Sequence, residues 1–233
     1  PYKKNGLDFS DAILTTDTCR KTAYFETKIG KKTFVVSGVT KGSGMIAPNM
    51  ATTLTYLVTN AAIPQQHLQT YLNTAIEKSY NMISVDSDTS TSDMVILFST
   101  GEHKFSLTDK QNCKLFQSLL DKTCLDLAMQ VVRDGEGATK IIEVSVDGAA
   151  NDQDARKISK SILDSPLVKT AIYGEDPNWG RVLMAAGKAD VKFNQDKLDL
   201  YFGEHLIFSK GDLLDYNMSD VLGVLKQSTV HIR

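Results

Sequence analysis

The 233-residue sequence lacks the features of several common protein classes. Its three cysteines, Cys19, Cys113 and Cys124, lie far apart and form no C-x-x-C pair, so neither a disulfide framework nor a zinc site is indicated. No apolar run approaches the roughly 18 to 20 residues of a membrane-spanning helix. No signal-peptide core follows Pro1. These absences favour a reducing compartment, the cytoplasm or an organellar matrix.

The chain also lacks an excess of charge of either sign. The 26 Lys and Arg nearly balance the 28 Asp and Glu, which gives a net charge of -2 and an isoelectric point near 6.1. Without a basic surface we expect no nucleic-acid partner. The four histidines form no H-E-x-x-H pattern, and neither a G-x-S-x-G nor a G-x-G-x-x-G motif is present. We therefore expect no bound metal, no serine-hydrolase elbow and no dinucleotide fold.

Hydrophobic periodicity predicts a compact, mixed α/β layered structure without a flexible linker. The helices are expected at 64–80, 109–132 and 152–163. The strands are expected at 23–29 and 33–39 as a hairpin, at 54–59, 94–98 and 141–146, and as two strands within 191–208 around a turn at 194–197. The chain opens on Pro1 rather than Met, and residues 230–233 alternate like a strand cut short. We expect both natural ends to lie beyond this sequence.

Four patches are dense in small or polar residues. Residues 15–18 (TTDT) suit a turn or cap as well as a site, because Thr and Asp compete for backbone hydrogen bonds. Residues 41–44 (KGSG) do not form a phosphate loop, since that motif requires Lys after the last glycine. A third patch consists of two segments, residues 133–140 and 174–181, which bracket carboxylates with glycines and fit either a pocket or a turn between elements.

The remaining patch, residues 50–54, offers a threonine at the start of a strand. Thr52 is either an ordinary β-branched residue of the strand or a nucleophile released by cleavage of the bond before it. In the second case, a new α-amine with a pKa near 7.7 to 8.0 acts as the base for its own hydroxyl. Composition alone leaves both alternatives open.

Taken together, these patches resemble the ornithine acetyltransferase (glutamate N-acetyltransferase) family, the bifunctional type of arginine biosynthesis. The matching segments follow the family order and span nearly the whole chain. They are residues 15–18 (TTDT), 41–52 (KGSGMIAPNMAT), 81–93 (NMISVDSDTSTSD), 135–140 (GEGATK) and 175–181 (EDPNWGR).

The resemblance implies an N-terminal-nucleophile-like, autoprocessed acyltransferase whose α/β fold is a mixed layered sandwich with two sheets between helices. The precursor would cut itself between Ala51 and Thr52. Residues 1–51 would then be the C-terminal part of an alpha chain. Residues 52–233 would be a beta chain that begins at the nucleophile and is truncated at its C-terminus. The local sequence fits, because small Ala51 lets the Thr52 hydroxyl reach the preceding carbonyl.

The function implied is transfer of an acetyl group from N2-acetylornithine to glutamate through an acetyl-Thr52 intermediate, without a cofactor. Thr15, Lys41 and Glu136 would line the substrate site with Thr52. Their chemistry suits Lys41 to a substrate carboxylate, Glu136 to the ornithine ammonium and Thr15 to an orienting contact. Whether acetyl-CoA also donates the acetyl group stays open. The resemblance further implies a dimer of alpha-beta units, in the cytoplasm or, in a eukaryote, the mitochondrial matrix.

The sequence departs from the family pattern in three places. Thr53 stands where the family usually has Met. The Thr-Gly pair of the family's oxyanion hole would lie upstream of Pro1, and two polar substrate-binding residues would lie beyond Arg233. Two alternatives therefore remain beside the acetyltransferase: an amidase or aminopeptidase of related architecture, in which water accepts the acyl group, and an inactive partial chain.

Overall fold

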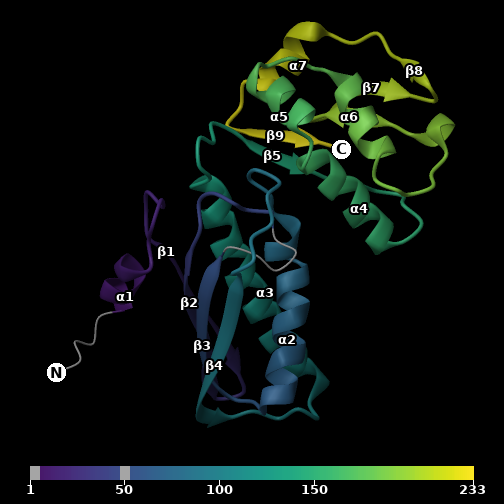
Figure 1. The fold of residues 1–233 in the computed structure, drawn as a ribbon. Coiled ribbons are helices and arrows are strands. Elements are labelled where there is room, and N and C mark those ends of the chain that lie inside the picture. Colours follow the sequence, from purple (N-terminus) through teal and green to yellow (C-terminus); the bar gives the residue numbers. More distant parts are fainter. Residues whose placement is uncertain (1–5, 48–52) are drawn as a thin grey trace. The chain divides into compact units, whose positions relative to one another are not determined.

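The computed structural model describes residues 6–47 and 53–233, and the chain divides into two compact units at Glu136 and Gly137 (Figure 1). The cleavage point expected between Ala51 and Thr52 lies outside the described residues. The boundary between the units lies within residues 135–140, one of the segments that match the family motifs. It does not lie in a Pro- or Ser-rich linker. Each unit has its own sheet and helices, so the expected mixed α/β class with two sheets is confirmed.

The first unit is built on a four-stranded sheet in the order β1-β2-β3-β4. The first three strands are antiparallel neighbours, whereas β4 runs parallel to β3 and is reached through helix α2. The elements in chain order are α1 (Gly6–Ala12), β1 (Lys21–Ile29), β2 (Lys32–Lys41), β3 (Leu54–Ala62), α2 (Gln65–Glu77), a 3₁₀ turn (Tyr80–Met82), β4 (Met94–Lys104) and α3 (Lys110–Arg133).

Strand alternation explains which face of this sheet is covered. In β2 every second residue from Phe34 to Thr40 is buried, and this face packs against α2 and α3. At Gly38 an added Cβ would lie 3.1 Å from Leu127 Cδ1 of α3, so the missing side chain allows the helix to approach closely. Lys41 follows Thr40 and therefore falls on the opposite face. The strand thus ends with a lysine turned away from the core.

The long helix α3 has clear start and stop signals. The Asp109 side chain accepts hydrogen bonds from the backbone N–H groups of Gln111 (3.0 Å) and Asn112 (3.1 Å), as an N-cap does. The helix ends at Arg133, and Asp134 forms its C-cap. The predicted helix 109–132 is therefore confirmed, and its end places Asp134 beside the loops described below.

The second unit contains a five-stranded sheet in the order β5-β9-β6-β7-β8. Its core includes Phe202, Ile207, Leu225 and Val230, and the Trp179 ring stacks on Phe208. The elements are β5 (Ile141–Val144), α4 (Asp152–Leu163), α5 (Pro166–Tyr173), α6 (Trp179–Gly187), a 3₁₀ turn (Gln195–Lys197), β6 (Leu200–Phe202), β7 (His205–Ser209), β8 (Asp212–Leu213), α7 (Met218–Leu225) and β9 (Thr229–Ile232).

One local prediction in this unit is wrong. The turn between the two expected strands lies at Gly203 and Glu204, not at 194–197, and Gly203 has the positive φ of 59° that this turn needs. Asn194 instead caps the 3₁₀ turn by accepting from the Asp196 N–H. Short helices α5, α6 and α7 were not predicted. Residues 174–181 form the connection from α5 to α6.

Candidate active site

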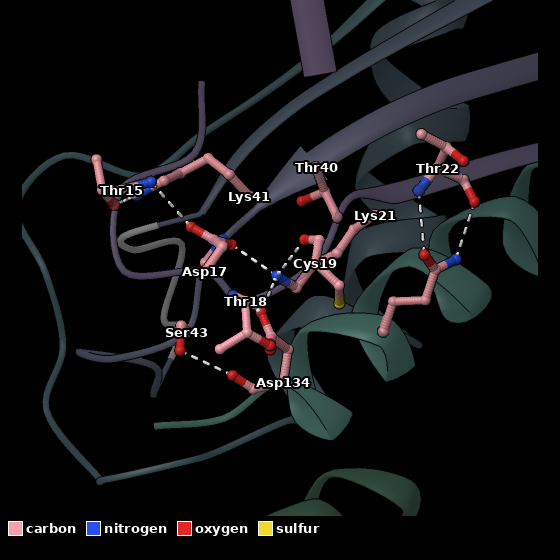
Figure 2. Close-up of polar contacts among 12 residues, drawn as sticks. Thr15, Asp17, Thr18, Cys19, Lys21, Thr22, Thr40, Lys41, Ser43 and Asp134 are labelled. Carbon is pink, nitrogen blue, oxygen red and sulfur yellow. Dashed lines mark hydrogen bonds and ion pairs between the residues drawn. The ribbon is translucent and has the colours of Figure 1, made fainter. Parts of the chain in front are cut away.

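Two of the predicted site residues meet at the end of β2. The Lys41 ammonium donates a 2.7 Å hydrogen bond to the hydroxyl of Thr15, which lies in the loop before β1 (Figure 2). Thr15 is exposed and Lys41 is half-buried, so both face solvent. Within the described residues the Lys41 ammonium has no carboxylate partner. As far as these residues show, its two remaining N–H donors can bind an anion.

Beneath this pair lies a buried cluster of three charges. Lys21, the first residue of β1, is completely buried, and its ammonium forms ion pairs with Asp17 (2.6 Å) and Asp134 (2.5 Å) (Figure 2). Its third hydrogen bond goes to the Cys19 carbonyl at 3.4 Å. All three donors of the ammonium are therefore used. This pairing offsets the several kcal/mol that burial of an isolated charge costs.

The two carboxylates of this cluster are held in the ionised form. Burial by itself would raise the pKa of Asp17, but the Lys21 ammonium and the Gly42 N–H outweigh it and lower that pKa. Burial likewise opposes ionisation of Asp134, and Lys21 together with the hydroxyl and N–H of Thr18 lowers its pKa. The cluster therefore carries one positive and two negative charges at neutral pH.

Both carboxylates also connect to the loop after β2. Asp17 accepts a 2.6 Å hydrogen bond from the backbone N–H of Gly42, the residue that follows Lys41. The Ser43 hydroxyl donates to the Asp134 carbonyl at 2.7 Å, and the Ser43 carbonyl accepts from the Glu136 N–H at 2.9 Å. These bonds join the segment that carries Lys41 to the segment that carries Glu136.

Glu136, the third predicted substrate residue described by the structure, lies against Gly44. A Cβ added at Gly44 would be only 2.4 Å from Glu136 Oε2, so the carboxylate fills the space that a side chain would take. Glu136 is exposed, and among the described residues its carboxylate has no hydrogen-bonding or cationic partner. The first unit therefore presents a cation at Lys41 and an anion near Gly44, three residues further along.

The strand register brings the beginning of β3 to the same place. Lys41 pairs with Leu54, and the described chain resumes at Thr53, which is buried. An added Cβ at Gly42 would lie 3.1 Å from Thr53 Cγ2, so this glycine allows a close approach. The predicted cleavage residues Ala51 and Thr52 lie outside the described residues. Of the four predicted substrate residues, Thr15, Lys41 and Glu136 belong to one unit.

Two aspartates of segment 81–93 also reach this region. The Asp86 carboxylate accepts hydrogen bonds from the backbone N–H groups of Met45 and Ile46 (2.9 Å to Ile46) and thereby holds the loop after β2. Asp93 differs, because neither of its buried oxygens accepts a hydrogen bond of normal geometry from any residue that the structure describes. Burial raises the pKa of Asp93 to about 6, although the nearby N–H of Thr53 lowers it in part.

The sequence patterns do not reveal the buried cluster. Asp17 and Asp134 lie in segments that the motifs mark, but no pattern assigns them a role or indicates Lys21. The available signal was the spacing of Asp17 and Lys21, four residues apart before a strand. The third member lies 113 residues beyond Lys21, a separation that no local pattern shows.

Membrane-spanning helices and clusters of metal-binding side chains are both absent from the described residues. None of the helices in ranges 6–47 and 53–233 is long and apolar enough to cross a membrane. Within the same ranges no three His, Cys, Asp or Glu side chains are grouped as a metal site would require.

Comparison with known proteins gives one consistent result. The sequence profile of the ArgJ family matches residues 2–233. The arginine biosynthesis bifunctional protein ArgJ of Bartonella henselae is 49% identical over 211 residues, which are 89% of this chain and 52% of that protein. The protein of the same name from Dehalococcoides mccartyi is 43% identical over 233 residues, 99% of this chain and 58% of that protein. The chain thus spans about half the length of the curated relatives it matches.

A solved structure shows the same likeness in three dimensions. The crystal structure of the arginine biosynthesis bifunctional protein ArgJ from Bacillus halodurans superposes with a TM-score of 0.71 at 38% identity. The match covers 76% of this chain and 85% of that one.

Proposed function

The chain belongs to the ArgJ family, and from that premise we propose that its protein transfers the acetyl group of N2-acetylornithine to glutamate in arginine biosynthesis. The observation that supports the proposal is a pair of charges in the first unit that have no ionic partner among the described residues. Within residues 6–47 and 53–233, Lys41 keeps donors for a carboxylate, and Glu136 keeps a carboxylate for an ammonium. N2-acetylornithine carries both complementary groups, a carboxylate at one end and an ammonium at the other.

The proposed chemistry uses Thr52 as the nucleophile. Its hydroxyl oxygen attacks the acetyl carbonyl, its own α-amine takes the proton, and the amide C–N bond breaks as that proton passes to the departing ornithine amine. Glutamate then attacks the acetyl-threonine ester through its neutral amine, a new amide forms and the ester C–O bond breaks. The proton that the glutamate amine loses passes through the Thr52 α-amine to the Thr52 oxygen. Two acyl transfers through the ester replace direct transfer of the acetyl group between two amines. The activation barrier of each step is lower than that of the direct exchange.

The choice of Thr52 over its neighbour has local support. Thr53 is buried immediately before β3, and its carbonyl accepts a 2.9 Å hydrogen bond from the Met94 N–H. A side chain with so little exposure to solvent is poorly suited to attack a substrate. We propose that self-cleavage between Ala51 and Thr52 releases the amine that the mechanism needs, with an alpha chain ending at Ala51 and a beta chain starting at Thr52.

The oligomeric state, the cellular location and the cofactor requirement are proposed from the resemblance to the family. We propose that two alpha-beta units form a dimer, that the protein works in the cytoplasm, and that it requires no cofactor. Use of acetyl-CoA as an additional acetyl donor is tested by supplying acetyl-CoA and glutamate without N-acetylornithine. N-acetylglutamate made under those conditions would establish the second donor, and its absence would restrict the enzyme to acetylornithine.

Product analysis on the full-length encoded protein tests the transfer itself. With N2-acetylornithine and glutamate, we expect ornithine and N-acetylglutamate in equal amounts. Without glutamate, release of free acetate at the same rate would instead support a hydrolase, an alternative that the family match does not favour. Glu136→Gln should weaken binding of N2-acetylornithine by roughly 10- to 100-fold, the value of a charge-assisted hydrogen bond. Binding of N-acetylnorvaline, which lacks the ammonium, should change little.

A further inference from the structure

Lys21 is a buried charge that the proposed chemistry does not use. Its ammonium has no exposure to solvent, and it is surrounded by Asp17, Asp134 and the Cys19 carbonyl. Replacing such a cluster by apolar side chains is often neutral or stabilising for the fold. Stability alone therefore does not account for a lysine at this place.

The cluster is connected to the segments that carry both charges proposed to bind substrate. On one side Asp17 fixes the Gly42 N–H at 2.6 Å, directly after Lys41. On the other side Asp134 precedes Glu136 by two residues, and Ser43, in the segment that carries Lys41, bonds to the backbone of both Asp134 and Glu136. In the described part of the chain, Lys21 is the one cationic group that pairs with both carboxylates (Figure 2).

We propose that Lys21 is a positioning residue that fixes the spacing between the Lys41 ammonium and the Glu136 carboxylate. It thereby determines the length of the acetylated diamino acid that the site accepts. The inference rests on the proposed function, because it takes Lys41 and Glu136 as the two substrate contacts. Lys21 touches neither the substrate nor the reacting atoms, and it acts only through Asp17 and Asp134.

The physical reason is the repulsion that Lys21 removes. Without the ammonium, two buried carboxylates would face each other, and they would either separate or share a proton. Separation moves Gly42 on one side and the segment from Asp134 to Glu136 on the other. A protonated carboxyl also becomes a weaker acceptor for the Gly42 N–H. Either outcome alters the distance between the two substrate contacts.

The test compares chain-length selectivity in the full-length protein. We would measure KM and kcat for N2-acetylornithine and for N2-acetyllysine, which is one methylene longer, and count active sites by acetyl-enzyme formation. Lys21→Met should raise KM for N2-acetylornithine about tenfold, as expected for the loss of roughly one charge-assisted contact. The preference for N2-acetylornithine over N2-acetyllysine should fall by a similar factor. Values of kcat per active site should change much less.

Two further variants keep the test decisive. Ser43→Ala removes the hydroxyl bond to the Asp134 carbonyl without changing a buried charge, and it should lower selectivity in the same direction by about threefold even if Lys21→Met fails to fold. Lys78→Met is the matched control, because it breaks a lysine–carboxylate pair with Asp121 (2.8 Å) in the same unit. Its KM and selectivity should equal those of the wild type.

The outcomes separate the two proposals. A wild-type protein that makes no acetyl-enzyme from N2-acetylornithine would refute the proposed function. A wild-type protein that makes it, with Lys21→Met and Ser43→Ala variants whose KM and selectivity per active site are unchanged, would overturn the role of Lys21 alone. Lower selectivity in both variants, with the Lys78→Met control unchanged, would support it.

Discussion

The Lys41 ammonium and the Thr15 hydroxyl lie 2.7 Å apart, although 26 residues separate them in the sequence. The bond orients a lysine at the end of β2 toward solvent rather than toward a protein carboxylate. A neutral partner fixes the position of the ammonium without neutralising its charge. The charge thus stays available for a substrate carboxylate.

Replacing Thr15 tests this orientation. Thr15→Val keeps the shape of the side chain but removes the acceptor, so Lys41 should lose its fixed position. We expect KM for N2-acetylornithine to rise about five- to tenfold, the value of one hydrogen bond of 1 to 1.4 kcal/mol, with little change in kcat. Steady-state kinetics of the full-length protein provide the measurement. Thr15→Ser, which retains the hydroxyl, should behave as wild type, and an unchanged KM for Thr15→Val would contradict the orienting role.

Gly44 provides a test of the carboxylate at the other end. A methyl group at this position would lie 2.4 Å from Glu136 Oε2, and the backbone there does not need a positive φ. Gly44→Ala should therefore displace the flexible Glu136 side chain at little cost in stability, while KM for N2-acetylornithine rises about tenfold. Thermal unfolding and kinetics measured together separate the two effects.

The matched control for that variant is Gly223→Ala. An added Cβ at Gly223 meets nothing within 4 Å, and the residue lies inside helix α7. The variant should leave KM unchanged and should stabilise the fold by up to about 1 kcal/mol. If Gly44→Ala leaves KM unchanged as well, the placement of Glu136 beside Gly44 has no part in substrate binding.

Asp93 should make stability depend on pH. Its folded-state pKa is raised from 3.8 to about 6, so the folded protein binds the proton more tightly than the unfolded chain does. The contribution of this proton to the free energy of unfolding is fully present below pH 3.8 and is lost as the pH rises through about 6. Asp93→Asn should abolish this loss and stabilise the protein above pH 7 by about 1 to 2 kcal/mol, after allowance for partial exposure.

Chemical denaturation at several pH values checks this prediction. Asp88→Asn is the control, because Asp88 is exposed and its removal should change stability by less than about 0.5 kcal/mol. Equal pH profiles for wild type and Asp93→Asn would show that the Asp93 carboxylate is not held in an unfavourable environment.

The sequence predicted those parts of the fold that local patterns control. The β1–β2 hairpin and the helices α3 and α4 were found because turn residues and regular spacing mark them. The helices α5 to α7 were missed because eight or nine residues give too little periodicity to read. The turn near 194–197 was misplaced because Asn194 and Asp196 favour a local cap as strongly as a hairpin.

The site was predicted in the same uneven way. The motifs indicated Thr15, Lys41 and Glu136 because those residues lie in segments with distinctive composition. Lys21 was not indicated, since a lysine at the start of a strand is ordinarily exposed and gives no sign of burial. Its environment depends on Asp134, which only the folding of α3 against the sheet brings near. An ion pair between residues that lie 113 positions apart in the sequence forms only when the tertiary structure brings them together.

The mass of the fragment that begins at Thr52 tests the proposed mechanism most directly. The full-length protein should be found cut between Ala51 and Thr52. After incubation with N2-acetylornithine alone, the fragment starting at Thr52 should gain one acetyl group, and added glutamate should remove it as N-acetylglutamate. A folded protein that remains uncut, or an acetyl group that never appears on Thr52, would contradict the proposed mechanism.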